Sequence, residues 1–169
     1  MKVSFWQDPQ FYRKQTYLLL FALVLSVVFA YSPVFIIKSG DANWAEVSGG
    51  QVLIHQSQAA ISEIWWPKVL FPVVVIAILA IAVAIFSFAN RKQQIQIARI
   101  CFLTQIVCLT LPYLISNYVV GKFSNSSQVL VMTFSYGLIL PILNLLLIAF
   151  SIKLVQQDIK RLKSMDRLR

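Results

Sequence analysis

Residues 69–89 read VLFPVVVIAILAIAVAIFSFA, an apolar run that holds no charged side chain. Three further runs of the same kind lie at about residues 16–37, 100–120 and 129–152. Each has close to the ~20 residues that an α-helix needs to cross the hydrocarbon core of a bilayer. Because backbone polar groups in hydrocarbon must pair within their own segment, these runs are predicted to be four transmembrane helices. The predicted fold class is an all-α integral membrane protein of one domain, residues 1–169.

Composition and charge narrow the class of protein further. Hydrophobic residues make up 59% of the chain and charged residues 12%, which excludes a soluble monomer. The formal net charge is +9, an excess that would suggest a nucleic-acid partner in a soluble protein. Here the charges flank the predicted spans, so nucleic acid is excluded and membrane lipid is the expected partner.

The basic residues are distributed unevenly between the two sides of the predicted membrane. Twelve of the fifteen lie before the first span, between the second and third, or after the fourth. The other side holds only Lys38, Lys68 and Lys122. Cytoplasmic segments of membrane proteins carry the excess of Lys and Arg, so both termini are predicted to be cytoplasmic.

The longest connection, residues 38–67, is predicted to face away from the cytoplasm. Pro33 disfavours helical geometry in the residue before it, so the first helix is expected to end near Tyr31, although apolar residues continue to Ile37. Before the second span, a short helix at Ala59–Ile64 and the pair Trp65-Trp66 are expected to lie in the outer headgroup layer.

A small β-like structure is predicted in and just before this extracytoplasmic loop. Its strand-like runs are rich in β-branched and aromatic residues, and the last two flank the turn sequence Ser48-Gly49-Gly50. The runs are Val34–Ile37, Trp44–Val47 and Gln51–Ile54. We expect a hairpin or small sheet that rests on the outer membrane face.

Polar side chains are rare in the spans, and the third and fourth spans hold the amides. Gln105 and Asn117 lie in the third span, and Asn144 lies in the fourth. Amides in a membrane tend to hydrogen-bond to other helices, each bond contributing ~1 kcal/mol. These three residues are therefore the candidate helix-packing residues, in a seam between the third and fourth helices. Pro112 and Pro141 are expected to kink these two helices.

The fourth helix is predicted to continue past the membrane as a basic cytoplasmic extension, residues 153–169. Apolar residues recur there at steps of three or four, namely Ile152, Val155, Ile159, Leu162 and Met165. Two interpretations stay open: the tail contacts anionic lipid, or it docks a partner protein through its apolar stripe. The candidate contact residues are Ile159, Lys160, Arg161, Leu162 and Lys163.

Residues that could perform chemistry are few. His55 is the only histidine, which excludes a bis-histidine haem and leaves too few ligands for an ordinary zinc site. Cys101 and Cys108 are seven residues apart, ~10.5 Å along a helix, which is too far for a disulfide. All six carboxylates lie outside the spans. We therefore predict that the protein is not an enzyme and has no catalytic, cofactor-binding or metal-binding residue and no cofactor.

Two stretches of the chain resemble a known family. Residues 13–20, RKQTYLLL, are similar to an Arg-x-Gln-(Ser/Thr)-aromatic-Leu-Leu-Leu start, and residues 158–169 resemble a basic tail that closes on Asp-Arg-(Leu/Ile)-Arg. The basic second loop, residues 90–96, fits the same family. On these motifs the chain is identified as a member of domain-of-unknown-function family 4293, four-helix inner-membrane proteins of Bacteroidota. The resemblance covers essentially the whole chain except residues 1–10, which precede the usual start of the family.

This resemblance implies a multi-pass protein of the bacterial cytoplasmic (inner) membrane, and it implies no activity. The leading hypothesis is a non-catalytic accessory, assembly or scaffold subunit that contacts a membrane-protein complex. The alternative is a small-solute or lipid transporter or channel that acts as an oligomer. Its polar path would run along Gln105, Asn117, Ser135 and Asn144.

Overall fold

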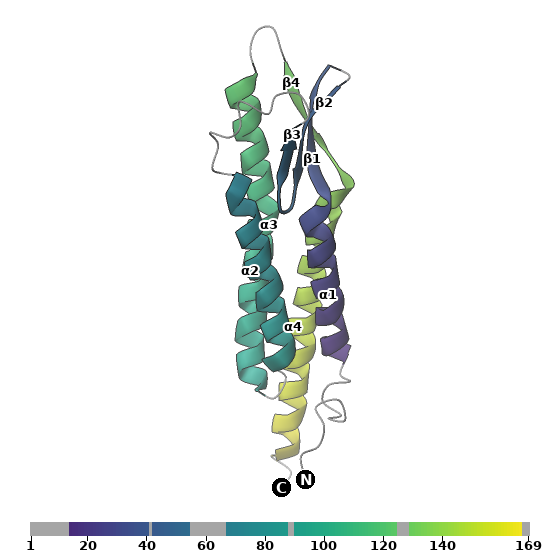
Figure 1. Cartoon of the computed structure of the whole chain (residues 1–169). Coiled ribbons are helices and arrows are strands. Elements are labelled where there is room, and N and C mark those ends of the chain that lie inside the picture. The colour runs from purple at the N-terminus through teal and green to yellow at the C-terminus, as the bar shows by residue number, and fades with distance from the viewer. Residues whose placement is uncertain (1–13, 41, 55–66, 88–89, 125–128, 167–169) are drawn as a thin grey trace.

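The computed structural model describes residues 14–40, 42–54, 67–87, 90–124 and 129–166. It is an elongated bundle of helices with a small sheet at one end (Figure 1). The helices are α1 Lys14–Tyr31, α2 Pro67–Phe86, α3 Arg91–Phe123 and α4 Ile139–Asp166. The strands are β1 Pro33–Ser39, β2 Ala42–Ser48, β3 Val52–Ile54 and β4 Leu130–Phe134, and a short 3₁₀ turn, η4 Tyr136–Leu138, precedes α4.

Each helix packs against two others, so that α1, α2, α3 and α4 form a closed ring of antiparallel neighbours. The inward face of α2 shows how the sequence directs this packing. Its buried residues recur at steps of three or four, the spacing of one helix face; they are Leu70, Val74, Ala77, Ile81 and Ala84. Phe71, Ile76, Leu79 and Val83 outside this face are exposed, and the small alanines let neighbouring helices approach closely.

Three of the described helical segments are long and apolar enough to cross a membrane. They are Lys68–Phe86, Lys92–Phe123 and Tyr136–Lys160. The apolar part of α1, Gln15–Tyr31, is shorter. The chain is thus mostly helical, with apolar helices compatible with a membrane protein, and it carries an antiparallel sheet in addition.

The predicted boundaries of the first and fourth spans are wrong at their sheet ends. Residues 33–37 of the first run are part of β1, and residues 130–134 of the fourth run form β4. The two strands pair antiparallel, with Phe35 opposite Phe134 and Ser39 opposite Leu130. The strand expected at Val34–Ile37 and the helix end expected near Tyr31 are confirmed. For residues 130–134, apolar content alone did not distinguish strand from helix, because a fully buried strand and a span are both runs of Val, Ile, Leu and Phe.

The expected kink at Pro141 does not arise, because this proline is the third residue of α4. The first four amides of a helix have no partner within the helix, so a proline there removes no hydrogen bond. Pro112, in contrast, lies inside α3. The tail prediction is confirmed in its helical part: α4 continues without a break to Asp166.

The sheet has the strand order β3-β2-β1-β4. The hairpin predicted around Ser48-Gly49-Gly50 is confirmed, with Val47 opposite Val52 and the Ser48 amide donating to the Gln51 carbonyl at 2.8 Å. The fourth strand was missed, because β4 comes from the connection between α3 and α4 and not from the long loop.

The Gly49-Gly50 turn also covers the end of α1. The Gly50 amide donates to the Ala30 carbonyl at 2.9 Å, and the Gly49 amide donates to the Ser32 carbonyl at 3.4 Å. The last carbonyls of a helix have no partner within it, so these bonds satisfy groups that would otherwise be left over. A Cβ at Gly49 would collide with the Phe29 carbonyl and ring, so only glycine allows this close approach.

The sheet covers the part of α3 that extends beyond the other helices. At 33 residues α3 is ~50 Å long, well beyond the ~30 Å of a bilayer core. Its last turns are covered by the sheet: Trp44 packs on Phe123 with ring centroids 5.6 Å apart, and Phe35 packs on Tyr113 at 6.1 Å. One face of this part of α3, with Ile115 and Val119, is thus buried against the strands.

Several predicted features lie outside the described residues. They are the helix at Ala59–Ile64, the Trp65-Trp66 pair, His55 and residues 1–10.

Candidate functional site: a buried polar seam

Three polar side chains from three helices meet in the interior of the bundle. Ser26 of α1 accepts a hydrogen bond from Gln105 Nε2 of α3 at 3.2 Å and another from Asn144 Nδ2 of α4 at 2.8 Å. All three are buried, with at most 2% of their surface exposed. We call this cluster the seam. The bond from Gln105 joins residues that are 79 positions apart in the chain, and the bond from Asn144 joins residues that are 118 positions apart.

Ser26 is the hub of the seam. Its hydroxyl donates to the Ala22 carbonyl one turn back along α1, at 3.0 Å. A hydroxyl has one donor and two acceptor positions, so the bond to Ala22 and the two amides together use its full capacity. Since α1 and α3 are not among the neighbouring pairs of the ring, Gln105 reaches Ser26 across the bundle.

The structure brings Gln105 and Asn144 together, but through Ser26 of α1 and not by a bond between the third and fourth helices. The two amides do not bond to each other; each bonds to Ser26, which the sequence analysis missed. A lone serine in an apolar helix gives a weak signal, because its hydroxyl can bond to the carbonyl four residues back on its own helix. Ser32 does this without joining a seam, by donating to the Val28 carbonyl.

The structure does not bring Asn117 to the seam. Its side chain is exposed, and Nδ2 donates to the Tyr113 carbonyl on its own helix at 3.2 Å. Asn117 is twelve residues beyond Gln105, which turns it ~120° around α3. The two amides therefore point to different faces.

The seam leaves two hydrogen-bond acceptors unused. Gln105 Oε1 and Asn144 Oδ1 are buried and have no hydrogen-bond partner in the described part of the chain. An unsatisfied buried polar atom costs ~1–3 kcal/mol. The interior of the bundle therefore holds two hydrogen-bond acceptors, these two amide oxygens, that the three side chains do not use among themselves.

A second polar layer lies toward the end of the bundle away from the sheet. Gln15 and Gln94 are each eleven residues before Ser26 and Gln105, close to three helical turns, so they share the same helix faces ~16.5 Å away. Both are buried; Gln94 Nε2 donates to the Ala84 carbonyl at 3.3 Å, whereas neither amide atom of Gln15 has a partner among the residues that the structure describes.

The chemistry available at these layers is neutral. Amides and hydroxyls can donate and accept hydrogen bonds, but they do not supply a general base, a metal ligand set or an activated nucleophile. Within the described residues, no three His, Cys, Asp or Glu side chains come together. Cys101 and Cys108 are free and buried, each packed in a different apolar cluster.

The described part of the tail contributes two of the five predicted contact residues. Ile159 is half-buried and Lys160 is exposed. The side chains of Arg161, Leu162 and Lys163 lie outside the described part, although their backbone continues α4.

These features define the class of fold. It is a mostly helical apolar bundle with a neutral polar seam inside it and a small antiparallel sheet at one end. Comparison with known families gives a more specific assignment. The model of the family described as Domain of unknown function (DUF4293) matches residues 11–168, so the chain belongs to this family. The match begins at the residue where the resemblance of the sequence begins. No curated protein and no solved structure matches the chain.

Proposed function

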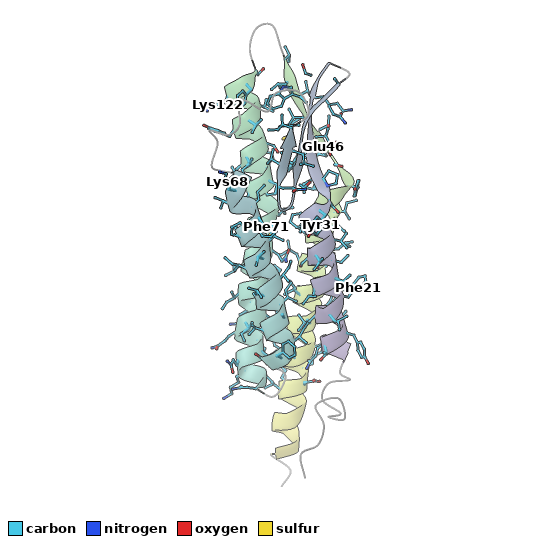
Figure 2. All side chains as sticks on the ribbon, viewed as in Figure 1. Phe21, Tyr31, Glu46, Lys68, Phe71 and Lys122 are labelled. Atoms are coloured by element: carbon cyan, nitrogen blue, oxygen red, sulfur yellow. The ribbon has the colours of Figure 1, made fainter. Side chains whose placement is uncertain are left out.

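We propose that this chain is a non-catalytic integral protein of the bacterial cytoplasmic membrane, an accessory, assembly or scaffold subunit that crosses the bilayer four times. The observation that carries the proposal is the distribution of polarity. Large apolar side chains are exposed around the bundle, among them Phe21, Ile76, Leu103 and Leu146, and Phe21 points away from the bundle in Figure 2. An exterior of this kind is matched by lipid and not by water.

The charges support an orientation with both termini in the cytoplasm. Lys68 and Lys122 lie at the sheet end of the bundle (Figure 2). The opposite end, where α1 begins and α4 ends, carries Lys92, Lys153 and Lys160. Lys38 of β1 also belongs to the sheet end, but in the sequence twelve of the fifteen basic residues precede the first apolar run, separate the second from the third or follow the fourth. The positive-inside rule assigns the end with this excess to the cytoplasm.

The tail supports the role of a subunit. From Asn144 to Asp166, α4 continues ~33 Å beyond the level of the seam, whereas α2 ends at Phe86. Figure 1 shows α4 extending past the other helices. Ile152 and Val155 of its apolar stripe pack inside the bundle, so the segment from Ile159 onward is the surface that a partner can bind.

Purification of the intact protein from native membranes tests this role. We expect a partner to co-purify in fixed stoichiometry, and we expect Ile159→Asp combined with Leu162→Asp to release it while membrane insertion persists. Gln156→Asp is the matched control, because it adds the same charged side chain to the same segment at an exposed position outside the apolar stripe. A wild-type protein that is recovered alone, as a monodisperse species, would contradict the proposal.

One observation favours a second candidate, a small-solute or lipid transporter or channel. Unpaired polar atoms occur at both interior layers, on Gln15, Gln94, Gln105 and Asn144. Groups of this kind could line a path for a polar solute. Solute flux into vesicles that contain the purified protein, lost in Gln105→Leu but not in Asn117→Leu, would favour this candidate over the subunit role.

A further inference from the structure

A groove lies between α1 and α4 at the end of the bundle away from the sheet. It encloses about 310 Å³ and is lined by Leu18 of α1 and by Phe150, Lys153, Leu154 and Gln157 of α4. Three of these five side chains are apolar, and along α4 the lining begins with Phe150 and continues with Lys153 and Gln157, with Leu154 between them. On this helix the groove therefore begins apolar and becomes cationic toward the end, with apolar side chains beside the cation.

The same division continues along the outer face of α4. Leu143, Leu146 and Phe150 are exposed by 43%, 52% and 58%. They are followed on the same helix face, at steps of three or four residues, by Lys153, Gln157 and Lys160. This stripe of α4 passes from exposed apolar side chains to basic and amide side chains as the helix leaves the apolar part of the bundle.

We propose that this groove binds one anionic phospholipid, with the phosphate at Lys153 and Gln157 and an acyl chain along Phe150, Leu146 and Leu143. Basic pockets between helices at the cytoplasmic surface recognise anionic headgroups, and long basic side chains reach from apolar surroundings toward the headgroup layer. The inference rests on the membrane location in the proposed function, but not on the role as a subunit.

Charge favours the lipid over the other occupants of such a face. In α1 there is no acidic residue, and Asp158 of α4 is turned ~100° away from Gln157. A second copy of the chain that packed in parallel through the same stripe would place Lys153 against Lys153, and like charges across an interface are unfavourable. The phosphate of a lipid supplies the missing negative charge.

The test is native mass spectrometry of the purified full-length protein in detergent. Dioleoyl phosphatidylglycerol and dioleoyl phosphatidylcholine are added separately, so that acyl chains are matched and only the headgroup differs. We expect the anionic lipid to be retained preferentially. We expect Lys153→Gln to weaken its binding about fivefold, the fold-change that ~1 kcal/mol per basic residue corresponds to.

Two further variants separate the contributions of headgroup and chain. Lys92→Gln, an exposed lysine at the same end of the bundle on α3, should bind both lipids as the wild type does. Phe150→Ala should weaken both lipids equally, because it removes only a chain contact. Inorganic phosphate at millimolar concentration should not displace the lipid, since phosphate lacks the chains.

Specific results would overturn the inference. Equal retention of the two lipids by the wild type would do so, as would an equal loss of preference in Lys92→Gln and Lys153→Gln. Displacement by inorganic phosphate would assign the site to a free anion. A dimer that the wild type forms and Lys153→Gln does not form would assign the face to a second copy. None of these results would bear on co-purification of a partner, so failure here is distinct from failure of the subunit role.

Discussion

Replacing Ser26 with alanine is expected to destabilise the bundle more than replacing either of the larger amides that bind it. The substitution removes one oxygen and leaves Gln105 Nε2 and Asn144 Nδ2 buried without their acceptor. Because each unsatisfied buried donor costs ~1–3 kcal/mol, the free energy of unfolding in detergent should fall by ~2–4 kcal/mol. Gln105→Leu or Asn144→Leu breaks one bond and also removes an unpaired oxygen, so each should cost only ~1 kcal/mol.

A combined variant makes this prediction sharper. When Ser26→Ala, Gln105→Leu and Asn144→Leu are joined, no unpaired donor is left, so the loss should be smaller than the sum of the three single losses. Asn117→Leu is the matched control, since this amide is exposed and bonds only to its own helix. Unfolding free energies of these five variants and of the wild type in one detergent give the comparison. Additive losses, or an effect of Asn117→Leu as large as that of Ser26→Ala, would contradict a shared hub.

Replacing Gly137 with alanine is expected to damage the junction between the sheet and α4. A Cβ at this position would collide with the Pro33 carbonyl oxygen and lie 2.8 Å from its carbon, and it would approach Ser32 Cβ at 3.2 Å. The obstacle is backbone that β1 holds in place, so it cannot move aside as a flexible side chain would. Overpacking of this kind costs ~1–3 kcal/mol, which thermal unfolding in detergent should record.

Gly121→Ala is the matched control for this substitution. Gly121 lies in α3 with nothing within 4 Å of an added Cβ. Alanine is favoured over glycine in a helix, so this variant should be ~0.5–1 kcal/mol more stable than the wild type. If both variants changed stability in the same direction, the close approach of Gly137 to Pro33 would not be the cause.

The sequence predicts the helices of this protein well and the strands only in part. Charge-free runs of Leu, Val and Ile identify α2 and α3, and the apolar stripe of the tail identifies the continuation of α4. Pro33 correctly marks the end of α1. The hairpin of β2 and β3 follows from its glycine turn. β4 does not follow, because its pairing with β1 joins segments about 95 residues apart, and no local pattern encodes a partner at that distance.

The seam illustrates the same limit at the level of side chains. Gln105 and Asn144 stand out because amides are costly in an apolar helix unless they are paired. Asn117 has the same amide group, but it lies on a different face of α3 and therefore does not reach the seam. Ser26 gives no distinct signal until the packing of α1 between α2 and α4 is known. Residue type thus indicates which side chains need partners, while the geometry of the bundle decides which partners they find.

The most direct test of the account is a map of which residues face each side of the membrane. Cysteine is introduced singly at Asn43, Lys92, Lys122 and Lys160, all exposed in the structure, and intact spheroplasts are treated with a membrane-impermeant maleimide. The native Cys101 and Cys108 are buried, so the wild type should stay unlabelled. We expect Asn43→Cys and Lys122→Cys to react in intact spheroplasts, and Lys92→Cys and Lys160→Cys to react only after the membrane is opened. Reaction of Lys92→Cys or Lys160→Cys from outside would contradict the four-span arrangement with its sheet facing away from the cytoplasm.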